Sequence, residues 1–319
     1  MPRRISLLAA LLLAGWTDRA DAFCRTSTCD PASGSCSLDA AGCPQGAPLQ
    51  WPLRCVGVSL HETASKQVAY ADFDRVARAA FGAWNSVDCG GSPASVSVEV
   101  LGPIACGQRV FNQDKGNANI VLFRDDSWPY AGAGSVLALT TMTFNSKTGV
   151  VSDADIEINA ASPDKVLTAS DNNVQIDLQS ILTHEAGHFL GLGHTPVQEA
   201  TMFSDYKPGT ISLRDLAEDD RAGLCAAYPP DRSGLASCDP KAATPSSAGF
   251  STLCSGDDKT ATKPSTQTPQ STESNDSGSC ATARGTPGAR AQAPLWLLAL
   301  WGLRRQARRP RSWVTQSPV

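Results

Sequence analysis

Three histidines and one glutamate lie within eleven residues, from His184 to His194. His184 and His188 are one helical turn apart, so both imidazoles project from the same face of a helix and can bind one ion. Glu185 lies beside that face, where its carboxylate can take a proton from a water molecule on the ion. Gly191 favours a left-handed turn that ends the helix, and the chain then returns His194 as a third nitrogen ligand. The stretch therefore predicts a metal site with one open position.

The ligand set indicates which ion this site binds. Three protein ligands plus a water molecule are typical of a catalytic zinc, whereas a structural zinc usually has four protein ligands. The chain contains four histidines, and three of them are in this stretch. The alternative is a helix whose histidines only cap or pack, but the concentration of histidine favours a zinc site.

The residues after the motif give a resemblance to a known family. Met202 follows the third histidine closely, and the long motif with this methionine resembles the zinc signature and Met-turn of the metzincin peptidases. The stretches 195–203 and 216–229 look like the matrixin branch, and the resemblance covers about residues 51–230. It implies an α/β, zincin-like catalytic domain with a twisted mixed sheet, a long helix, an active-site helix and a C-terminal helix.

The resemblance also implies an activity, that of a zinc-dependent endopeptidase. In this interpretation a general base activates water, the metal polarises the cleaved carbonyl group, and a methionine forms an apolar floor under the site. The competing hypothesis is a surface binding or adhesion module that keeps the zinc but does not cleave. The presence of the glutamate favours the peptidase. The implied zinc ligands are His184, His188 and His194, the general base is Glu185, and the Met-turn residue is Met202.

The matrixin resemblance further implies where a substrate binds. An extended peptide is expected to pair with an edge strand at residues 137–141. The pocket for the residue after the cleaved bond is expected along residues 196–206. The predicted substrate-pocket residues are Leu137, Ala138, Leu139, Pro196 and Tyr206.

Hydrophobic periodicity predicts the helices and strands that position the motif. Apolar residues at helical spacing predict helices, and two-residue alternation predicts strands. The predicted strands are 51–61, 95–101, 118–123, 135–144 and 150–159. The predicted helices are 72–87, 176–190 and 213–228. We expect the acidic side chains of the last helix on its exposed side, namely Asp215, Glu218, Asp219 and Asp220.

A second metal site is expected to differ from the matrixin pattern. Matrixins normally hold a structural zinc with histidines from the segment before the active-site helix, but residues 118–160 contain no histidine. We therefore expect no structural zinc. Acidic side chains there could bind calcium instead, because calcium prefers oxygen ligands, and the alternative is a solvated acidic strand edge. The candidate calcium ligands are Asp125, Asp126, Asp153, Asp155 and Glu157.

The N-terminal sequence predicts export. Residues 1–22 combine two arginines at positions 3 and 4, an apolar run and a small-residue cleavage site, so they are interpreted as a signal peptide that is cut before Phe23. Eleven cysteines then imply an oxidising compartment with disulfides, of which sequence alone cannot give the connectivity.

Residues 23–50 are expected to form a Cys-rich extension. A zinc ribbon from Cys24 to Cys43 is the alternative, but the spacing lacks paired C-x-x-C motifs. Cys55 lies in a segment that faintly resembles the matrixin latency switch, and a disulfide role for it is favoured.

The C-terminal sequence predicts a tail outside the catalytic domain. Residues 231–279 are rich in Ser, Thr and Pro and are interpreted as a linker, with a small loop closed by Cys238 and Cys254. Residues 280–319 contain a cysteine, a short apolar run and an arginine cluster, and they resemble the C-terminal sorting tag of myxobacterial surface proteins. This resemblance implies that Cys280 is modified by cell-surface sorting machinery; the alternative is an ordinary tail anchor.

The charge balance bears on possible partners. Residues 23–280 carry 17 basic and 29 acidic side chains, a net charge of −12. This balance argues against a nucleic acid partner. The sequence therefore predicts an exported, monomeric protein at the outer cell surface or outside the cell that acts on a protein or peptide substrate.

Overall fold

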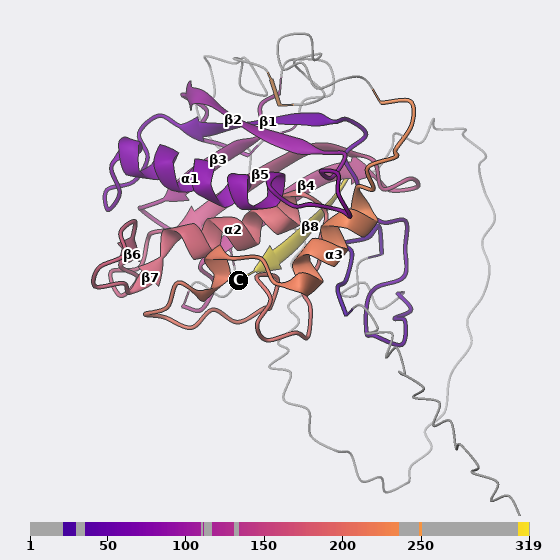
Figure 1. Ribbon diagram of the computed structural model, residues 1–319. Helices are drawn as coiled ribbons and strands as arrows, with labels where there is room; N and C mark the ends of the chain where they lie inside the picture. Colours follow the sequence, from indigo (N-terminus) through magenta and orange to yellow (C-terminus); the bar gives the residue numbers. More distant parts are fainter. Residues whose placement is uncertain are drawn as a thin grey trace, which may run out of the picture.

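A mixed sheet with helices packed against one face forms the body of the protein (Figure 1). The computed structural model describes residues 22–29, 36–109, 111, 117–130, 134–235 and 249–250, and the backbone of residues 312–318. In this part of the chain the strands are β1 (Cys55–His61), β2 (Ser97–Ile104), β3 (Ile120–Arg124), β4 (Ala138–Asn145), β5 (Val151–Asn159), β6 (Leu167–Thr168), β7 (Ile176–Asp177) and β8 (Ser312–Pro318). The helices are α1 (Tyr70–Asn85), α2 (Leu178–Phe189) and α3 (Glu218–Ala227), with a 3-10 turn at Ser212–Arg214.

The sheet has the strand order β2-β1-β3-β5-β4-β8, while β6 and β7 form a separate pair. β1 runs parallel to β2 and β3, and β3 runs parallel to β5. β4 runs antiparallel to β5 and to β8. Parallel neighbours need long crossover connections, and α1 provides the one between β1 and β2. The mixed sheet, the long helix α1, the motif-bearing helix α2 and the C-terminal helix α3 confirm the predicted α/β fold class.

The two faces of the sheet bury different apolar side chains. On β3, Val121 and Phe123 belong to the main core, whereas Ile120 and Leu122 belong to a smaller cluster. This division follows from the two-residue period of a strand. α1 and α2 pack against the main core side of the sheet (Figure 1). Burying a large apolar side chain contributes about 1.5–3 kcal/mol, so the apolar stripe of α1 fixes this helix on the sheet. The buried stripe is Phe73, Val76, Ala77, Ala80, Phe81 and Trp84.

The predicted helix over 213–228 is wrong in its first part. Asp215 and Ala217 have extended backbone, so the 3-10 turn ends before them and α3 begins only at Glu218. The expectation that Asp220 is exposed is also wrong, because only 1% of this residue is accessible to solvent. Its carboxylate instead accepts hydrogen bonds from the backbone around Met202.

β8 lies on the outer side of β4, so the strand expected to form the edge is not the outermost strand. The pairing runs from Leu139, opposite Pro318, to Asn145, opposite Ser312. Figure 1 shows β8 in yellow beside β4. Ala138, the first residue of β4, lies beyond the end of this pairing.

Disulfides, and not a zinc ribbon, hold the N-terminal extension. The four cysteines that a ribbon would use form two disulfides within the extension. A third disulfide joins the loop after α1 to α3. Cys55 and Cys106 are also disulfide-bonded, which confirms the disulfide role expected for Cys55. The three disulfides with assigned pairs are Cys24–Cys43, Cys29–Cys36 and Cys89–Cys225.

Parts of the predicted organisation lie outside the described residues. The signal peptide up to residue 21, the predicted loop of Cys238 and Cys254, and the predicted sorting cysteine Cys280 all belong to those parts. Among the helices of the described residues, none is long and apolar enough to cross a membrane.

Candidate metal centre and active site

Helix α2 is fixed at both ends, and this positions its two histidines. At its start, Asp177 caps the helix by accepting a hydrogen bond from Ser180 N at 2.8 Å. Arg214 binds the same carboxylate through two nitrogens, at 2.8 and 2.6 Å. At its end, the Tyr228 hydroxyl donates to Leu190 O at 3.0 Å. Gly191 then adopts a φ of +83°, which confirms the predicted left-handed turn and directs the chain back towards the helix.

The three predicted zinc ligands converge on one point. His184 Nε2 lies 3.0 Å from His188 Nε2, which lies 3.2 Å from His194 Nε2. A tetrahedral zinc with Zn–N bonds of about 2.0–2.1 Å requires nitrogen ligands about 3.3 Å apart. The spacing and the all-imidazole donor set therefore fit a zinc ion. Among the described residues, this trio is the group of side chains that could hold a metal ion.

The protein fixes the orientation and protonation of these ligands. His184 Nδ1 donates to Thr201 O at 2.6 Å, and His188 Nδ1 donates to Leu192 O at 2.8 Å. Because each Nδ1 carries the proton, each Nε2 presents a lone pair to the ion. Burial, reinforced by His194, lowers the pKa of His184 to about 3. Burial also lowers the pKa values of His188 and His194. All three imidazoles are therefore neutral at neutral pH, which is the form that binds zinc.

Glu185 lies beside the trio in a fully buried position. Its Oε2 accepts a hydrogen bond from the Thr140 hydroxyl of β4, whereas its Oε1 has no hydrogen-bond partner. Burial raises the pKa of Glu185 to about 8, and the Thr140 hydrogen bond opposes that rise. A buried carboxylate oxygen without a hydrogen-bond partner lowers the stability of the fold unless it binds a ligand or a proton. Thr140 was not predicted from the sequence, because nothing local in β4 indicates that it meets α2.

Met202 packs against the turn of α2 that joins His184 and His188. It is buried, and its Sδ packs where a side chain on Gly187 would lie. The ring of Trp84 from α1 borders the same place, and its Nε1 donates to Thr183 O at 2.8 Å. Glycine at position 187 thus lets the methionine and the tryptophan approach the helix between the two ligands.

Asp220 holds the backbone that carries Met202. Its Oδ2 accepts from Thr201 N at 2.7 Å and from Ala217 N at 2.8 Å, and its Oδ1 accepts from Met202 N at 3.0 Å. Burial raises the pKa of Asp220, while these three N–H donors oppose the rise. Since Thr201 O orients His184, this carboxylate supports a predicted zinc ligand through one intervening residue.

Comparison with known proteins agrees with this geometry. A sequence model of one peptidase family, described as Matrixin, matches residues 51–229, which is more than half of the chain. The chain belongs to the matrixin family.

Among its matrixin relatives, metalloendoproteinase 4-MMP of Arabidopsis thaliana is 33% identical over 180 residues, covering 56% of this chain and 46% of that protein. Metalloendoproteinase 1 of Glycine max is 35% identical over 103 residues, covering 32% of each chain. Matrilysin of Homo sapiens is 31% identical over 103 residues, covering 32% of this chain and 35% of that protein. This matrixin thus spans less than half the length of these relatives.

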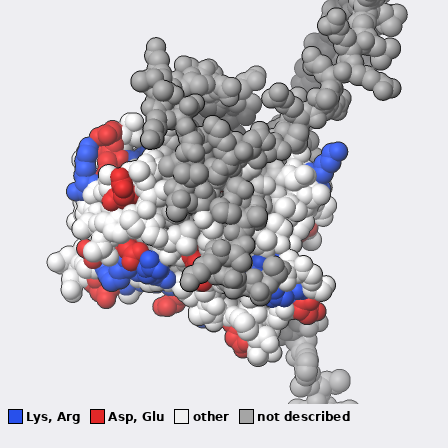
Figure 2. Space-filling view, turned by 90° about the horizontal axis from the view of Figure 1, so that it is seen from above, with Lys and Arg blue, Asp and Glu red and all other residues white. Residues whose placement is uncertain are grey.

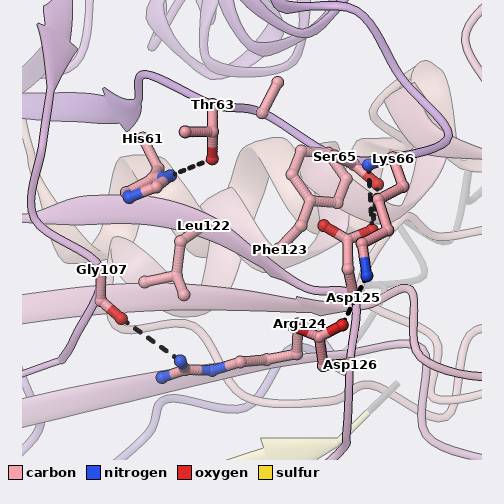
Figure 3. A pocket seen from close by; sticks show the side chains of 11 residues that line it. His61, Thr63, Ser65, Lys66, Gly107, Leu122, Phe123, Arg124, Asp125 and Asp126 are labelled. Carbon is pink, nitrogen blue, oxygen red and sulfur yellow. Dashed lines mark hydrogen bonds and ion pairs between the residues drawn. The ribbon is translucent and has the colours of Figure 1, made fainter.

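The fourth histidine lies apart from the metal centre. His61 lines a cavity of about 410 Å³ at the ends of β1 and β3 (Figure 3), and none of the three converging histidines lines this cavity. Two of the candidate calcium ligands, Asp125 and Asp126, line it as well. Asp125 accepts hydrogen bonds from Ser65 Oγ and Lys66 N, and Asp126 pairs with Lys66 Nζ. Binding of calcium by these two carboxylates stays a prediction.

The other three candidate calcium ligands lie on β5. Glu157 is neutralised by Arg124 and Arg109 and accepts a hydrogen bond from Tyr130. Asp155 accepts from Ile120 N at 3.0 Å. Asp153 is 3% exposed, and its Oδ1 has no hydrogen-bond partner. Burial raises the pKa of Asp153 to about 8, and burial together with Asp153 raises the pKa of Asp155.

The buried carboxyl of Asp153 predicts a pH-dependent stability. Its pKa is about 8 in the folded protein and about 3.9 in the unfolded chain, so the folded state holds the extra proton. The stability that this group contributes is present below pH ~4 and is lost as pH rises to ~8. We expect the free energy of unfolding to fall across this range. Asp153→Asn should remove this group's share of the pH dependence and stabilise the protein at pH 8 by several kcal/mol, because the amide is neutral at every pH.

Urea unfolding between pH 4 and pH 9 measures this effect, with Asp231→Asn as an exposed control. Added calcium provides a second arm, because a calcium site at Asp153 would stabilise the parent and not the Asp153→Asn protein. A parent profile that does not change between pH 4 and pH 8 would contradict the prediction.

The predicted substrate-pocket residues lie in two parts of the chain, one before and one after α2. Leu137 and Ala138 lie at the start of β4, and Asn159 N donates to Leu137 O at 2.8 Å. Pro196 is exposed. The hydroxyl of Tyr206 accepts from Asp177 N at 2.8 Å and donates to Thr210 O at 2.7 Å. Tyr206 therefore ties its loop to the start of α2, and its predicted contact with substrate stays a prediction.

Proposed function

We propose that this matrixin is a zinc-dependent endopeptidase whose zinc ligands are His184, His188 and His194 and whose general base is Glu185. One observation carries the proposal: three neutral imidazole nitrogens converge beside a buried carboxylate that has one oxygen without a partner. The metalloendoproteinase names of its relatives in plants support the same activity.

The chain's own residues account for the steps around the metal. Zinc in such a site supplies a Lewis acid that polarises a carbonyl group and makes a water molecule acidic at neutral pH. Glu185 Oε1 takes the proton of the attacking water and returns it to the leaving amine. The Thr140 hydroxyl holds the other oxygen of Glu185, so that the reacting oxygen keeps a fixed direction. Met202 and Trp84 close the site from below with apolar groups.

An extended substrate is expected to add as a strand beside β4. In an antiparallel pair, successive residues point their backbone groups to alternate sides. Leu137 O already bonds to β5, so the backbone groups of Ala138 point to the outer side, beyond the last residue of β8. A peptide can pair there through main-chain hydrogen bonds, as in other cases of β-augmentation.

Cleavage of a mixed peptide library by the full chain tests the function. We expect mass spectrometry to detect internal cleavage, a strong zinc chelator to stop it, and added zinc to restore it. If the chain binds one zinc ion but cuts no peptide, the adhesion-module hypothesis replaces the peptidase. If the chain binds no zinc, both hypotheses fail.

β8 is expected to compete with the substrate for the outer side of β4. Deleting residues 312–318 should lower KM about threefold and leave kcat unchanged, because it frees strand edge for β-augmentation without touching the zinc ligands. Steady-state kinetics on one library-derived peptide measures this effect, and thermal unfolding checks that the fold is intact. An unchanged KM in a folded deletion protein would show that β8 does not compete.

The proposal includes export and surface location. The disulfides of the N-terminal extension fit a protein that folds in an oxidising compartment. Over the described part of one face, Lys and Arg side chains lie beside Asp and Glu side chains (Figure 2). We therefore propose a protein or peptide as the partner. From the sequence of the tail, we propose Cys280 as the residue that the cell-surface sorting machinery modifies.

A further inference from the structure

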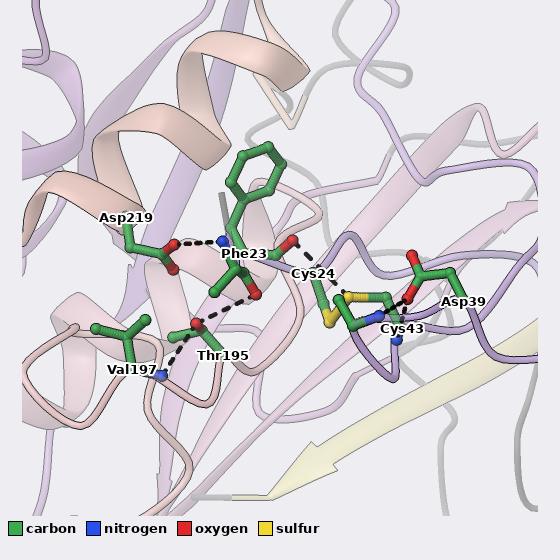
Figure 4. Close-up of a disulfide and its surroundings, with 9 residues drawn as sticks. Phe23, Cys24, Asp39, Cys43, Thr195, Val197 and Asp219 are labelled. Atoms are coloured by element: carbon green, nitrogen blue, oxygen red, sulfur yellow. Dashed lines mark hydrogen bonds between the residues drawn. A yellow bond between two sulfur atoms is a disulfide. The ribbon is translucent and has the colours of Figure 1, made fainter. Parts of the chain in front are cut away.

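The first described residues of the chain lie directly on the zinc-ligand loop. We call residues 23–26, which follow the predicted cleavage site, the N-terminal strap and residues 191–195 the zinc loop. The zinc loop leads from the end of α2 to His194 and the residue after it. The path of its backbone therefore sets the position of His194, the third ligand. Figure 4 shows the strap between the zinc loop, α3 and the extension that carries Cys43.

Backbone hydrogen bonds join the strap to the zinc loop. Thr26 N donates to Gly191 O at 3.0 Å, and Gly193 N donates to Cys24 O at 2.9 Å. Between these two bonds, Arg25 forms an antiparallel bridge with Leu192. The zinc loop is thus paired with the strap in the manner of a short antiparallel ladder, which restricts the backbone immediately before His194.

One side chain of the strap contacts the carbonyl that orients a zinc ligand. The Thr26 hydroxyl donates to Leu192 O at 2.9 Å. The same oxygen accepts from His188 Nδ1 at 2.8 Å. A carbonyl oxygen has two lone pairs, so it can accept both bonds. Thr26 therefore fixes the acceptor that sets the ring orientation and tautomer of His188.

Further contacts hold the strap in this place. Arg25 Nη2 donates to Leu49 O at 2.6 Å, and its Nε donates to Gly191 O at 3.3 Å. The Cys24–Cys43 disulfide ties the strap to the extension, with a Cα–Cα distance of 5.3 Å. On the other side of the strap, the Phe23 ring packs on α3, where Gly223 leaves room for it. The strap is therefore anchored on both sides of the zinc loop.

We propose that the N-terminal strap is a positioning element of the zinc site, in which Thr26 orients His188 through Leu192 O and the Cys24–Cys43 disulfide holds the strap on the zinc loop. This inference rests on the proposed zinc-binding function. It assigns the Cys-rich extension a role at the metal centre, because breaking the strap's contacts loosens two of the three ligands.

Zinc affinity, measured by competition with a chromophoric chelator on the full chain, tests the role of Thr26. Thr26→Val removes the hydroxyl and keeps the shape, and we expect it to weaken zinc binding about tenfold. Thr26→Ser should restore the affinity to within about twofold, since the donor returns. Thr28→Val is the matched control, because the Thr28 hydroxyl accepts from Ala47 N within the extension. It should leave zinc affinity unchanged.

The disulfide is tested by a second matched pair. Replacing Cys24 and Cys43 by serine should speed zinc release, whereas replacing Cys29 and Cys36 should not. Thermal unfolding of the zinc-free proteins separates positioning from general stability. If both disulfides are merely structural, both variants should melt at lower temperature than the parent and bind zinc with equal affinity. If the Cys24–Cys43 variant does not fold, the Thr26 and Thr28 pair decides.

The outcomes are distinguishable from failure of the proposed function. If Thr26→Val binds zinc as tightly as the parent, the positioning role is overturned. If Thr28→Val weakens zinc binding equally, the effect comes from the stability of the extension and the inference also fails. If the parent itself binds no zinc, the proposed function fails first.

Discussion

Replacing Glu185 by glutamine is expected to lower kcat/KM by about 10²- to 10⁴-fold, which is the contribution of a positioned general base. The amide keeps the size of the side chain but cannot take the proton of the attacking water. One end of the amide can still accept the bond from Thr140, so the fold around α2 should be retained. Zinc affinity should change little, because the three imidazoles are untouched.

Steady-state kinetics and zinc titration of the same protein sample measure the two effects together. Glu62→Gln is the matched control, because it makes the same chemical change at an exposed position just after β1. A Glu185→Gln protein with more than a tenth of the parent activity would assign the base to another group. A large loss of zinc in this variant would instead assign Glu185 to metal binding.

The pH dependence of the parent's activity also tests the assignment of Glu185 as the general base. Burial raises the pKa of Glu185, and a bound cation lowers it by attraction. Because the base must be ionised, activity is expected to fall as pH drops through this pKa, and it should do so in the parent and in the Glu62→Gln control alike.

The convergence of the three histidines could be predicted from sequence because they are close together in the chain. The helical spacing of His184 and His188, and the glycine that turns the chain back, are properties of eleven residues. Strands β1 to β5 were predicted for the same reason, since alternation is read within each segment, whereas β6, β7 and β8 were not predicted. Leu137 and Ala138 were predicted to contact substrate through the matrixin resemblance. The structure makes Ala138 the first residue of β4 and puts Leu137 just before it, and the contact with substrate stays a prediction.

The contacts that support the ligands could not be predicted, because each joins distant parts of the chain. Thr140 and Glu185 are 45 residues apart, and Thr26 and Leu192 are 166 apart. Sequence composition shows neither pairing. Asp220 was wrongly predicted to be exposed for the same reason. Its acidic side chain matched the pattern of a solvent-exposed helix face, but its hydrogen-bond donors come from the backbone of the Met-turn.

Replacing Asp220 by alanine is expected to cost about 3–5 kcal/mol of unfolding free energy. The change removes three hydrogen bonds to a charged acceptor, each worth about 1.5–3 kcal/mol when taken singly and less when summed. It also leaves the N–H groups of Thr201 and Met202 buried without their acceptor. For a domain of this size the melting temperature should fall by about 10 °C.

The same change should also weaken zinc binding, and this separates Asp220 from an ordinary core residue. Once Thr201 is released, its carbonyl no longer holds His184 Nδ1 in one orientation, so affinity is expected to drop about tenfold. Urea unfolding of the zinc-free protein and chelator competition measure the two effects separately. Asp215→Ala is the control, because that side chain is exposed just before α3. A loss below about 1 kcal/mol in Asp220→Ala, no larger than that of an ordinary substitution, would mean that other contacts hold the Met-turn and that the position of His184 does not depend on this carboxylate.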